Sequence, residues 1–234
     1  MSDALFQYPK AAAFGRVVPK TKIYEHAGAA SSLRDLFVGQ VDQVVWKFKL
    51  APETINLPAT RSVGEIQIFE ICLRTNDLDE AVLRAIDRAI PFPLIFELTW
   101  SGNRKAVAAF KRPSDSDQSK WVISEYFSTA WLPDSASRLP LPISLNLGGL
   151  YEALLMALIP VGSGVDEDIQ ARVGRAEAIR SKSREIERIA ARLRRVRQFN
   201  KRVDINAELR RARTELKMLQ QGNVKVEDPH HLSL

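Results

Sequence analysis

Two carboxylates and an amide stand at a spacing that metal-dependent phosphodiester chemistry can use. Pro52-Glu53 lies shortly before Glu65-Ile66-Gln67 in the chain. If the second group lies on a strand, Glu65 and Gln67 share one face, because strand side chains alternate. Carboxylate oxygens are hard ligands for Mg²⁺, and a bound Mg²⁺ can stabilise charge on a scissile phosphate. Glu53, Glu65 and Gln67 are therefore candidate catalytic residues, and Glu53 and Glu65 are candidate Mg²⁺ ligands.

The elements expected around these residues resemble the layout of metal-dependent nucleases of the PD-(D/E)XK type. Hydrophobic periodicity predicts a helix over 31–37, strands over 44–50, 54–57 and 65–73, a helix over 78–90 and a strand over 94–100. The motif is degenerate, because Gln67 stands where such sites usually carry a lysine. Short motifs also match by accident, and a glutamate on a solvated strand face is common. The preferred hypothesis is therefore a protein that has no catalytic residues and no cofactor. A nuclease that uses Mg²⁺ is the alternative hypothesis.

Four lysines near the start of the chain form a second candidate site. Lys20, Lys22, Lys47 and Lys49 alternate with apolar residues, a pattern that can direct ammonium groups along one side of a sheet toward phosphate. Outward strand positions also favour lysine because charge discourages edge pairing. The second explanation is preferred, while Lys20 and Lys22 remain candidate nucleic-acid ligands.

Positive charge is concentrated near the C-terminus. Residues 171–218 hold 16 Lys and Arg against 6 Asp and Glu, whereas the rest of the chain is net acidic. Six of these cations crowd into eleven residues and are the main candidate nucleic-acid ligands: Arg192, Arg194, Arg195, Arg197, Lys201 and Arg202. Such clusters bind phosphate through counterion release, although a solvated helix surface has the same composition. The expected partner is DNA or an acidic protein surface, and the sequence favours neither.

The architecture expected from these patterns is α/β in the wide sense (α+β): a mixed β-sheet with flanking helices plus a C-terminal antiparallel helical hairpin. Apolar residues repeat at coiled-coil spacing on both sides of an interruption near Phe199–Asp204. We expect an N-terminal arm over 1–18, an α/β domain over 19–160 ending in a linker and docking helix, a basic hairpin over 166–220 and a polar tail over 221–234.

Several function classes find no support in the sequence. The three histidines and the single Cys72 form no zinc or nucleophile pattern, and Gly148-Gly149 lacks the lysine and spacing of a phosphate loop. The apolar run 147–160 is too short to cross a bilayer, which takes about 20 residues. No secretory signal is apparent, so we expect a cytoplasmic protein with no membrane partner.

Five stretches of the chain resemble the bacterial family called domain of unknown function 4391. They are residues 19–25 (PKTKIYE), 46–56 (WKFKLAPETIN), 65–70 (EIQIFE), 89–93 (AIPFP) and 198–206 (QFNKRVDIN). The resemblance implies a genomic setting beside DNA methyltransferases and helicases of restriction-modification or phage-defence loci, without an activity or catalytic residues. The function expected is a non-catalytic accessory subunit that contacts DNA, a helicase or a DNA methyltransferase.

Overall fold

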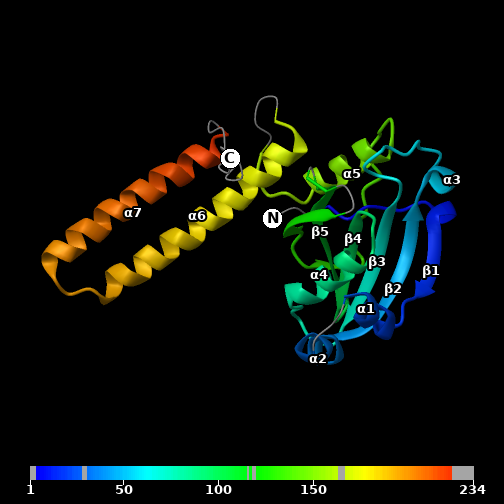
Figure 1. Ribbon diagram of the computed structural model, residues 1–234, viewed down its shortest axis with the longest axis horizontal. Helices are drawn as coiled ribbons and strands as arrows, with labels where there is room; N and C mark the ends of the chain where they lie inside the picture. The colour runs from blue at the N-terminus through cyan, green and yellow to red at the C-terminus, as the bar shows by residue number, and fades with distance from the viewer. Residues whose placement is uncertain (1–3, 28–30, 115, 118–119, 163–166, 223–234) are drawn as a thin grey trace. The chain divides into compact units, whose positions relative to one another are not determined.

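The computed structural model describes residues 4–27, 31–114, 116–117, 120–162 and 167–222. The chain divides into two compact units, Met1–Pro160 and Val161–Leu234 (Figure 1). The first unit is an α+β fold on a mixed sheet, and the second contains a pair of long helices. The fold class expected from the sequence is confirmed.

Among the described residues the sheet has seven strands. Six of them lie side by side in chain order, and the short β7 pairs with β5. Strands β1 to β3 are antiparallel neighbours, β3 and β4 are parallel, and β4 to β6 are antiparallel. The strands are β1 (Ala13–Val17), β2 (Val41–Leu50), β3 (Ile66–Leu73), β4 (Leu94–Trp100), β5 (Asn103–Pro113), β6 (Trp121–Ser128) and β7 (Leu132–Pro133).

Three helices pack against this sheet and share one hydrophobic core with it. They are α1 (Lys20–Ala27), α2 (Ser31–Gln40) and α4 (Glu80–Ala89). Ile23, Phe37 and Ile86 of these helices are buried in one cluster with Phe69 and Phe96 of the sheet. Helix α4 supplies the crossover that the parallel pair β3 and β4 requires. The shorter helices of this unit are η1 (Lys10–Ala12), α3 (Pro52–Ile55) and α5 (Leu147–Met156).

The structure corrects two secondary-structure expectations that bear on the site. Residues 54–57 form no strand, because Pro52 opens the short helix α3 and Asn56 ends it in the left-handed region with φ 54°. Strand β1 instead precedes the helices, so the expected order of helix, three strands, helix and strand is wrong. Because β1 pairs with β2, part of the expected N-terminal arm belongs to the sheet.

The second unit is a helical hairpin of α6 (Ile169–Arg195) and α7 (Phe199–Gln220). Its buried seam consists of Ile189 on α6 with Ile205, Leu209 and Ala212 on α7. These residues belong to the two apolar repeats expected from the sequence, and burying them against each other holds the pair together. Most of the expected polar tail lies outside the described residues. Of the helices that are described, none combines the length and apolarity needed to span a membrane.

Candidate functional site

The three candidate catalytic residues lie together around Lys49. The Nζ atom of Lys49 lies 2.7 Å from an oxygen of Glu53 and 3.3 Å from an oxygen of Glu65. The amide of Gln67 donates a hydrogen bond to the other oxygen of Glu65. Gln67 is buried and Glu53 is exposed, so the cluster extends from the sheet to solvent. Both carboxylates therefore approach one point, occupied here by an ammonium group.

The end of β2 and the start of β3 position this cluster. Lys49 and Gln67 are paired residues on these antiparallel strands. Thr54 fastens α3 to the end of β2, because its hydroxyl accepts from the backbone of Ala51 at 2.9 Å and donates to the carbonyl of Lys49 at 2.7 Å. Glu53 is thereby held beside the strand end. The strand predicted over residues 54–57 is not needed to bring the two carboxylates together, because the helical turn of α3 places Glu53 near Glu65.

Electrostatics in this cluster favour its charged form. The hydrogen bond from Lys49 lowers the pKa of Glu53, and the same bond raises the pKa of Lys49. A divalent cation bound by Glu53 and Glu65 would have to displace the lysine ammonium from between them. No group of three or more His, Cys, Asp or Glu side chains suited to a metal occurs within the described ranges. Mg²⁺ is often held by only two carboxylates together with water and substrate phosphate, so this pair meets the minimum.

The four lysines of the N-terminal half do not form one row. Lys20 and Lys22 lie on helix α1, whereas Lys47 and Lys49 lie on strand β2. Lys20 donates to the carbonyls of Phe37 and Val41, and its burial lowers its pKa. Lys22 pairs with an exposed carboxylate one helical turn away. The strand-like alternation was misleading because the residues after Pro19 form a helix instead, and Lys20 ties that helix to the end of α2.

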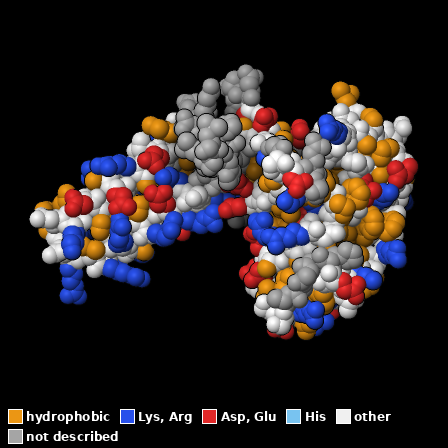
Figure 2. Space-filling view, in the orientation of Figure 1, with side chains coloured by type: hydrophobic (Ala, Val, Ile, Leu, Met, Phe, Trp, Pro, Cys, Tyr) orange, Lys and Arg blue, Asp and Glu red, His pale blue; other side chains and the backbone are white. Residues whose placement is uncertain are grey.

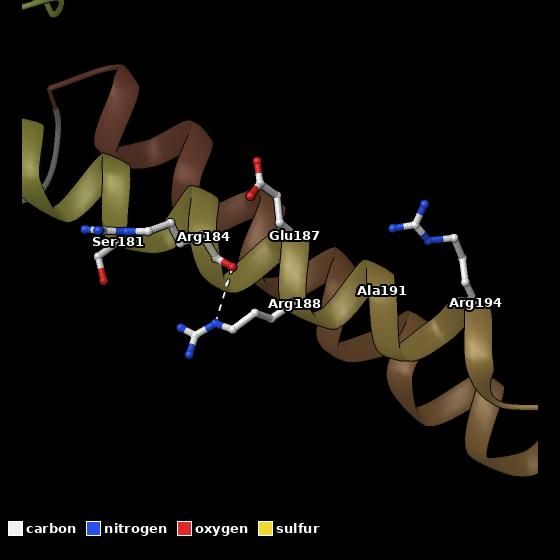
Figure 3. Close-up of a pocket in the computed structure, with 6 residues that line it drawn as sticks. All are labelled: Ser181, Arg184, Glu187, Arg188, Ala191 and Arg194. Atoms are coloured by element: carbon white, nitrogen blue, oxygen red, sulfur yellow. Dashed lines mark hydrogen bonds between the residues drawn. The ribbon is translucent and has the colours of Figure 1, made fainter. Parts of the chain in front are cut away.

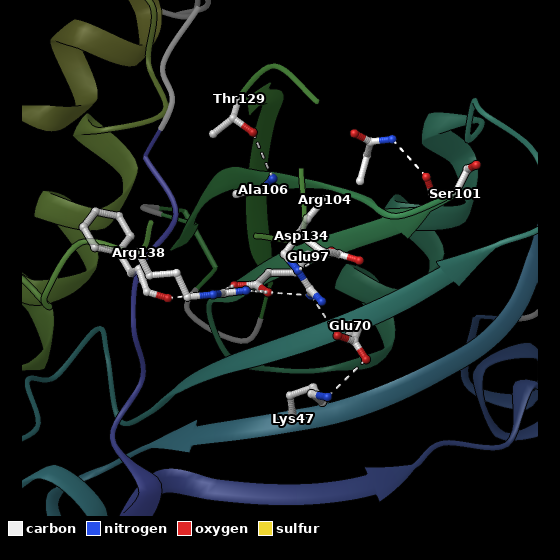
Figure 4. A network of polar contacts seen from close by, with 11 residues as sticks. Lys47, Glu70, Glu97, Ser101, Arg104, Ala106, Thr129, Asp134 and Arg138 are labelled. Atoms are coloured by element: carbon white, nitrogen blue, oxygen red, sulfur yellow. Dashed lines mark hydrogen bonds and ion pairs between the residues drawn. The ribbon is translucent and has the colours of Figure 1, made fainter. Parts of the chain in front are cut away.

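A buried charge network on the sheet was not identified from the sequence. Glu97 on β4, which is 5% exposed, accepts hydrogen bonds from Arg104 at 2.8 Å and from Arg138 at 2.8 Å (Figure 4). Arg104 also donates to Glu70 at 2.8 Å, and Lys47 lies 3.2 Å from Glu70. Burial opposes ionisation of Glu70, but the bonds from Arg104 and Lys47 outweigh it and lower its pKa. The one feature of the sequence that could have indicated this network is Glu97, a charged residue inside the apolar run of β4.

A second buried ion pair fastens helix α4 to β5. Lys111 is 2% exposed, its Nζ lies 3.6 Å from a carboxylate oxygen of Asp87, and it donates to the carbonyls of Asp87 and Ile90. The hydroxyl of Tyr126 donates to the same carboxylate. Burial raises the pKa of Asp87 to about 6, although Lys111 and Tyr126 offset part of that effect. Because all these groups are buried and satisfied by one another, we assign them to structure and not to catalysis.

The six main candidate nucleic-acid ligands lie exposed where α6 meets α7, a region that we call the hairpin tip and define as residues 192–203. Lys and Arg side chains project from the hairpin surface around this region (Figure 2). Arg192 pairs with Glu208 across the hairpin. The other five tip cations have no ion pair with the residues that the structure describes: Arg194, Arg195, Arg197, Lys201 and Arg202. Within the described part of the chain, no carboxylate pairs with these five charges.

The cationic surface continues from the tip along α6. An open depression follows one side of this helix and is lined by Ser181, Arg184, Glu187, Arg188, Ala191 and Arg194 (Figure 3). Arg188 donates to the backbone carbonyl of Arg184, one helical turn earlier, at 3.4 Å. The spacing of three to four residues places the lining on the side of α6 away from the buried seam. The positive surface is therefore longer than the tip alone.

The fold and these sites define a two-unit protein, with an α+β unit held by buried ion pairs and a helical hairpin with an exposed cationic tip. Residues 6–216 match the family described as domain of unknown function (DUF4391), and the chain belongs to this family. No curated protein and no solved structure matches the chain.

Proposed function

We propose that this protein is a non-catalytic accessory subunit of a cytoplasmic bacterial DNA restriction-modification or phage-defence complex. The hairpin contacts DNA, and a helicase or DNA methyltransferase partner supplies the chemistry. The observation that carries this proposal is the group of five exposed tip cations without an ion pair to any residue in the described part of the chain. Mutual repulsion in such a group disfavours the isolated state, and phosphate groups relieve it.

The ion pairs of the α+β unit support the same proposal. Glu97, Arg104 and Arg138 bind one another, and Lys111 binds Asp87 and the end of α4. Glu53 and Glu65 are joined through Lys49. These groups are engaged in holding elements together, which suits a unit that docks on a partner.

The partner part of the proposal predicts co-purification. When the tagged chain is expressed together with the genes that flank its own, a helicase or methyltransferase product should be recovered with it in stoichiometric amount. Digestion of nucleic acid before purification separates protein contact from tethering through shared DNA, and size-exclusion chromatography with light scattering gives the stoichiometry. Recovery of the chain alone, at low salt and with both neighbours present, would contradict an accessory role.

The second candidate function is a divalent-metal-dependent nuclease of the PD-(D/E)XK type. The specific observation in its favour is that Glu53 and Glu65 approach the same Nζ atom of Lys49, as two ligands of one cation must. The residues that would hold Mg²⁺ are Glu53 and Glu65, and Gln67 would orient Glu65 through its hydrogen bond. A bound Mg²⁺ would supply charge stabilisation at the scissile phosphate.

The nuclease predicts Mg²⁺- or Mn²⁺-dependent cleavage of plasmid and single-stranded DNA that disappears in Glu65→Ala. Loss of one of two carboxylate ligands should lower the cleavage rate by at least about 100-fold if the metal carries the reaction. Glu25→Ala, which removes an exposed carboxylate paired with Lys22 on α1, is the matched control. Equal cleavage by both variants identifies a contaminating enzyme, and no cleavage by the wild type removes this candidate.

A further inference from the structure

The hairpin tip carries an exposed aromatic side chain among its cations. Phe199, the first residue of α7, is 77% exposed, and Val203, one turn later, is 52% exposed. Every one of the five cations without an ion pair lies within five residues of Phe199 in sequence. The tip therefore combines one aromatic face with a surrounding positive field.

This aromatic group lies outside the buried seam of the hairpin. The seam of α7 runs through Ile205, Leu209 and Ala212. At roughly 100° per residue, Val203 lies about 160° around α7 from Ile205 and Phe199 about 120°, so Val203 points away from the seam and Phe199 lies on its flank. Any partner of Phe199 must come from outside the described part of the hairpin.

We propose that the hairpin tip binds single-stranded nucleic acid, with an unpaired base stacked on Phe199 and phosphates held by the surrounding arginines and lysine. The proposal rests on the DNA contact proposed above and adds the form of the nucleic acid. Surfaces that bind single strands combine aromatic groups for stacking with cations along the backbone. A base in a duplex has no free face, so duplex DNA can use the cations but not Phe199.

The composition of the tip favours this partner over three others. A protein interface has a packed apolar centre within about 800 Å² per partner, whereas the large exposed apolar side chains described at the tip are the two neighbours Phe199 and Val203. A membrane-surface helix needs a continuous apolar face, which the first turns of α7 lack. A second copy of the chain would bring another group of uncompensated cations against the first. A single aromatic face surrounded by positive charge matches a base attached to phosphates.

The test compares the affinity of the full chain for a single-stranded oligothymidylate and for a duplex of equal length, by fluorescence anisotropy. The wild type should prefer the single strand. Phe199→Ala should weaken single-strand binding roughly 5- to 100-fold, the range expected for one lost stacking contact, and leave duplex binding unchanged. Phe199→Trp should retain the affinity, and Phe199→Leu should lose it, because leucine keeps apolar volume without a stacking face. Folding is monitored by helix content, and exposed Phe199 has no packing role to lose.

The other outcomes distinguish failure of the single-strand proposal from failure of the proposed DNA contact. Equal affinity for both forms, with no effect of Phe199→Ala, would overturn the single-strand proposal and leave the DNA contact standing. Full affinity in Phe199→Leu would overturn stacking and indicate apolar docking instead. Binding to phosphatidylserine vesicles with no binding to either oligonucleotide would overturn both the inference and the proposed DNA contact.

Discussion

Replacement of Lys111 by methionine is expected to lower the free energy of unfolding of the α+β unit by about 3–5 kcal/mol, because it leaves an uncompensated buried charge on Asp87. It also removes the donor to the carbonyls of Asp87 and Ile90 at the end of α4. Methionine preserves most of the side-chain length, so the loss reports the polar contacts and not a cavity. Denaturant unfolding followed by tryptophan fluorescence measures this unit alone, since all four tryptophans lie before residue 161.

The matched control for this measurement is Lys120→Met. Lys120 is largely exposed and pairs with Asp117 at 3.1 Å on the surface. An exposed pair of this kind contributes at most about 1 kcal/mol. Equal losses in the two variants would contradict a structural role specific to the buried pair.

The pH profile gives a second readout of the same prediction. Burial raises the pKa of Asp87 from 3.8 to about 6. Between these values the folded protein holds a proton that the unfolded chain has released, so stability falls as pH rises from about 4 to about 6. In Lys111→Met the lost attraction raises the pKa of Asp87 further, and the fall should continue above pH 6. An unshifted profile would show that Lys111 does not act on Asp87.

Neutralising four cations at the hairpin tip is expected to reduce the salt dependence of DNA binding by about 3 to 4 units of log–log slope, since each phosphate contact contributes about 0.9. The variant replaces Arg194, Arg195, Arg197 and Arg202 by glutamine. At roughly 50 mM salt, such a change in slope accompanies an affinity loss on the order of 100-fold or more. Anisotropy titrations of duplex DNA between roughly 50 and 200 mM salt provide the slope.

A control variant with the same change in net charge tests whether the salt dependence comes from the tip cations or from the total charge of the protein. It neutralises four exposed cations of the α+β unit, Lys10, Arg16, Arg88 and Lys120, and should leave the slope nearly unchanged. An equal reduction in both variants would indicate nonspecific attraction by net charge. An unchanged slope in the tip variant would place DNA binding elsewhere, and an acidic protein would then explain the basic tip better.

Most strands of the sheet could be predicted from the sequence because the residues within each strand have a composition typical of strands. The β-branched and aromatic run of β3 and the apolar run of β4 favour strands. The prediction of a strand over residues 54–57 was wrong because the local hydrogen bonds that the Thr54 hydroxyl accepts and donates, and the fixed backbone of Pro52, outweigh strand propensity there. Residues 20–25 alternate like a strand but form α1, where Ile23 packs into the core.

Of the candidate sites, the Glu53 and Glu65 cluster was predicted from the sequence, whereas the two buried charge networks were not. Glu53 and Glu65 meet because the connection of residues 51–65 joins two antiparallel strands and begins with α3, which holds Glu53 beside the end of β2. The Glu97 network depends on which strands become neighbours and on Arg138 reaching the sheet from 41 residues away. The ion pair of Lys111 and Asp87 likewise joins an interior helix to a strand. No local periodicity encodes such pairings, which appear only once the strand order is known.

The bonds from residues 138 and 139 to the first residues of the chain constrain how the molecule can form during synthesis. Arg138 donates to the carbonyl of Phe6 at 2.7 Å, and Leu139 exchanges backbone hydrogen bonds of 2.8 Å with Leu5 and Gln7. The N-terminal segment therefore leaves the ribosome without its partners, and at 5–20 residues per second it waits on the order of 10 s for them. During that interval Leu5 and Phe6, both buried in the finished unit, are available to chaperones. Closure of the α+β unit thus waits until residues 138 and 139 have left the ribosome and can bind the N-terminal segment.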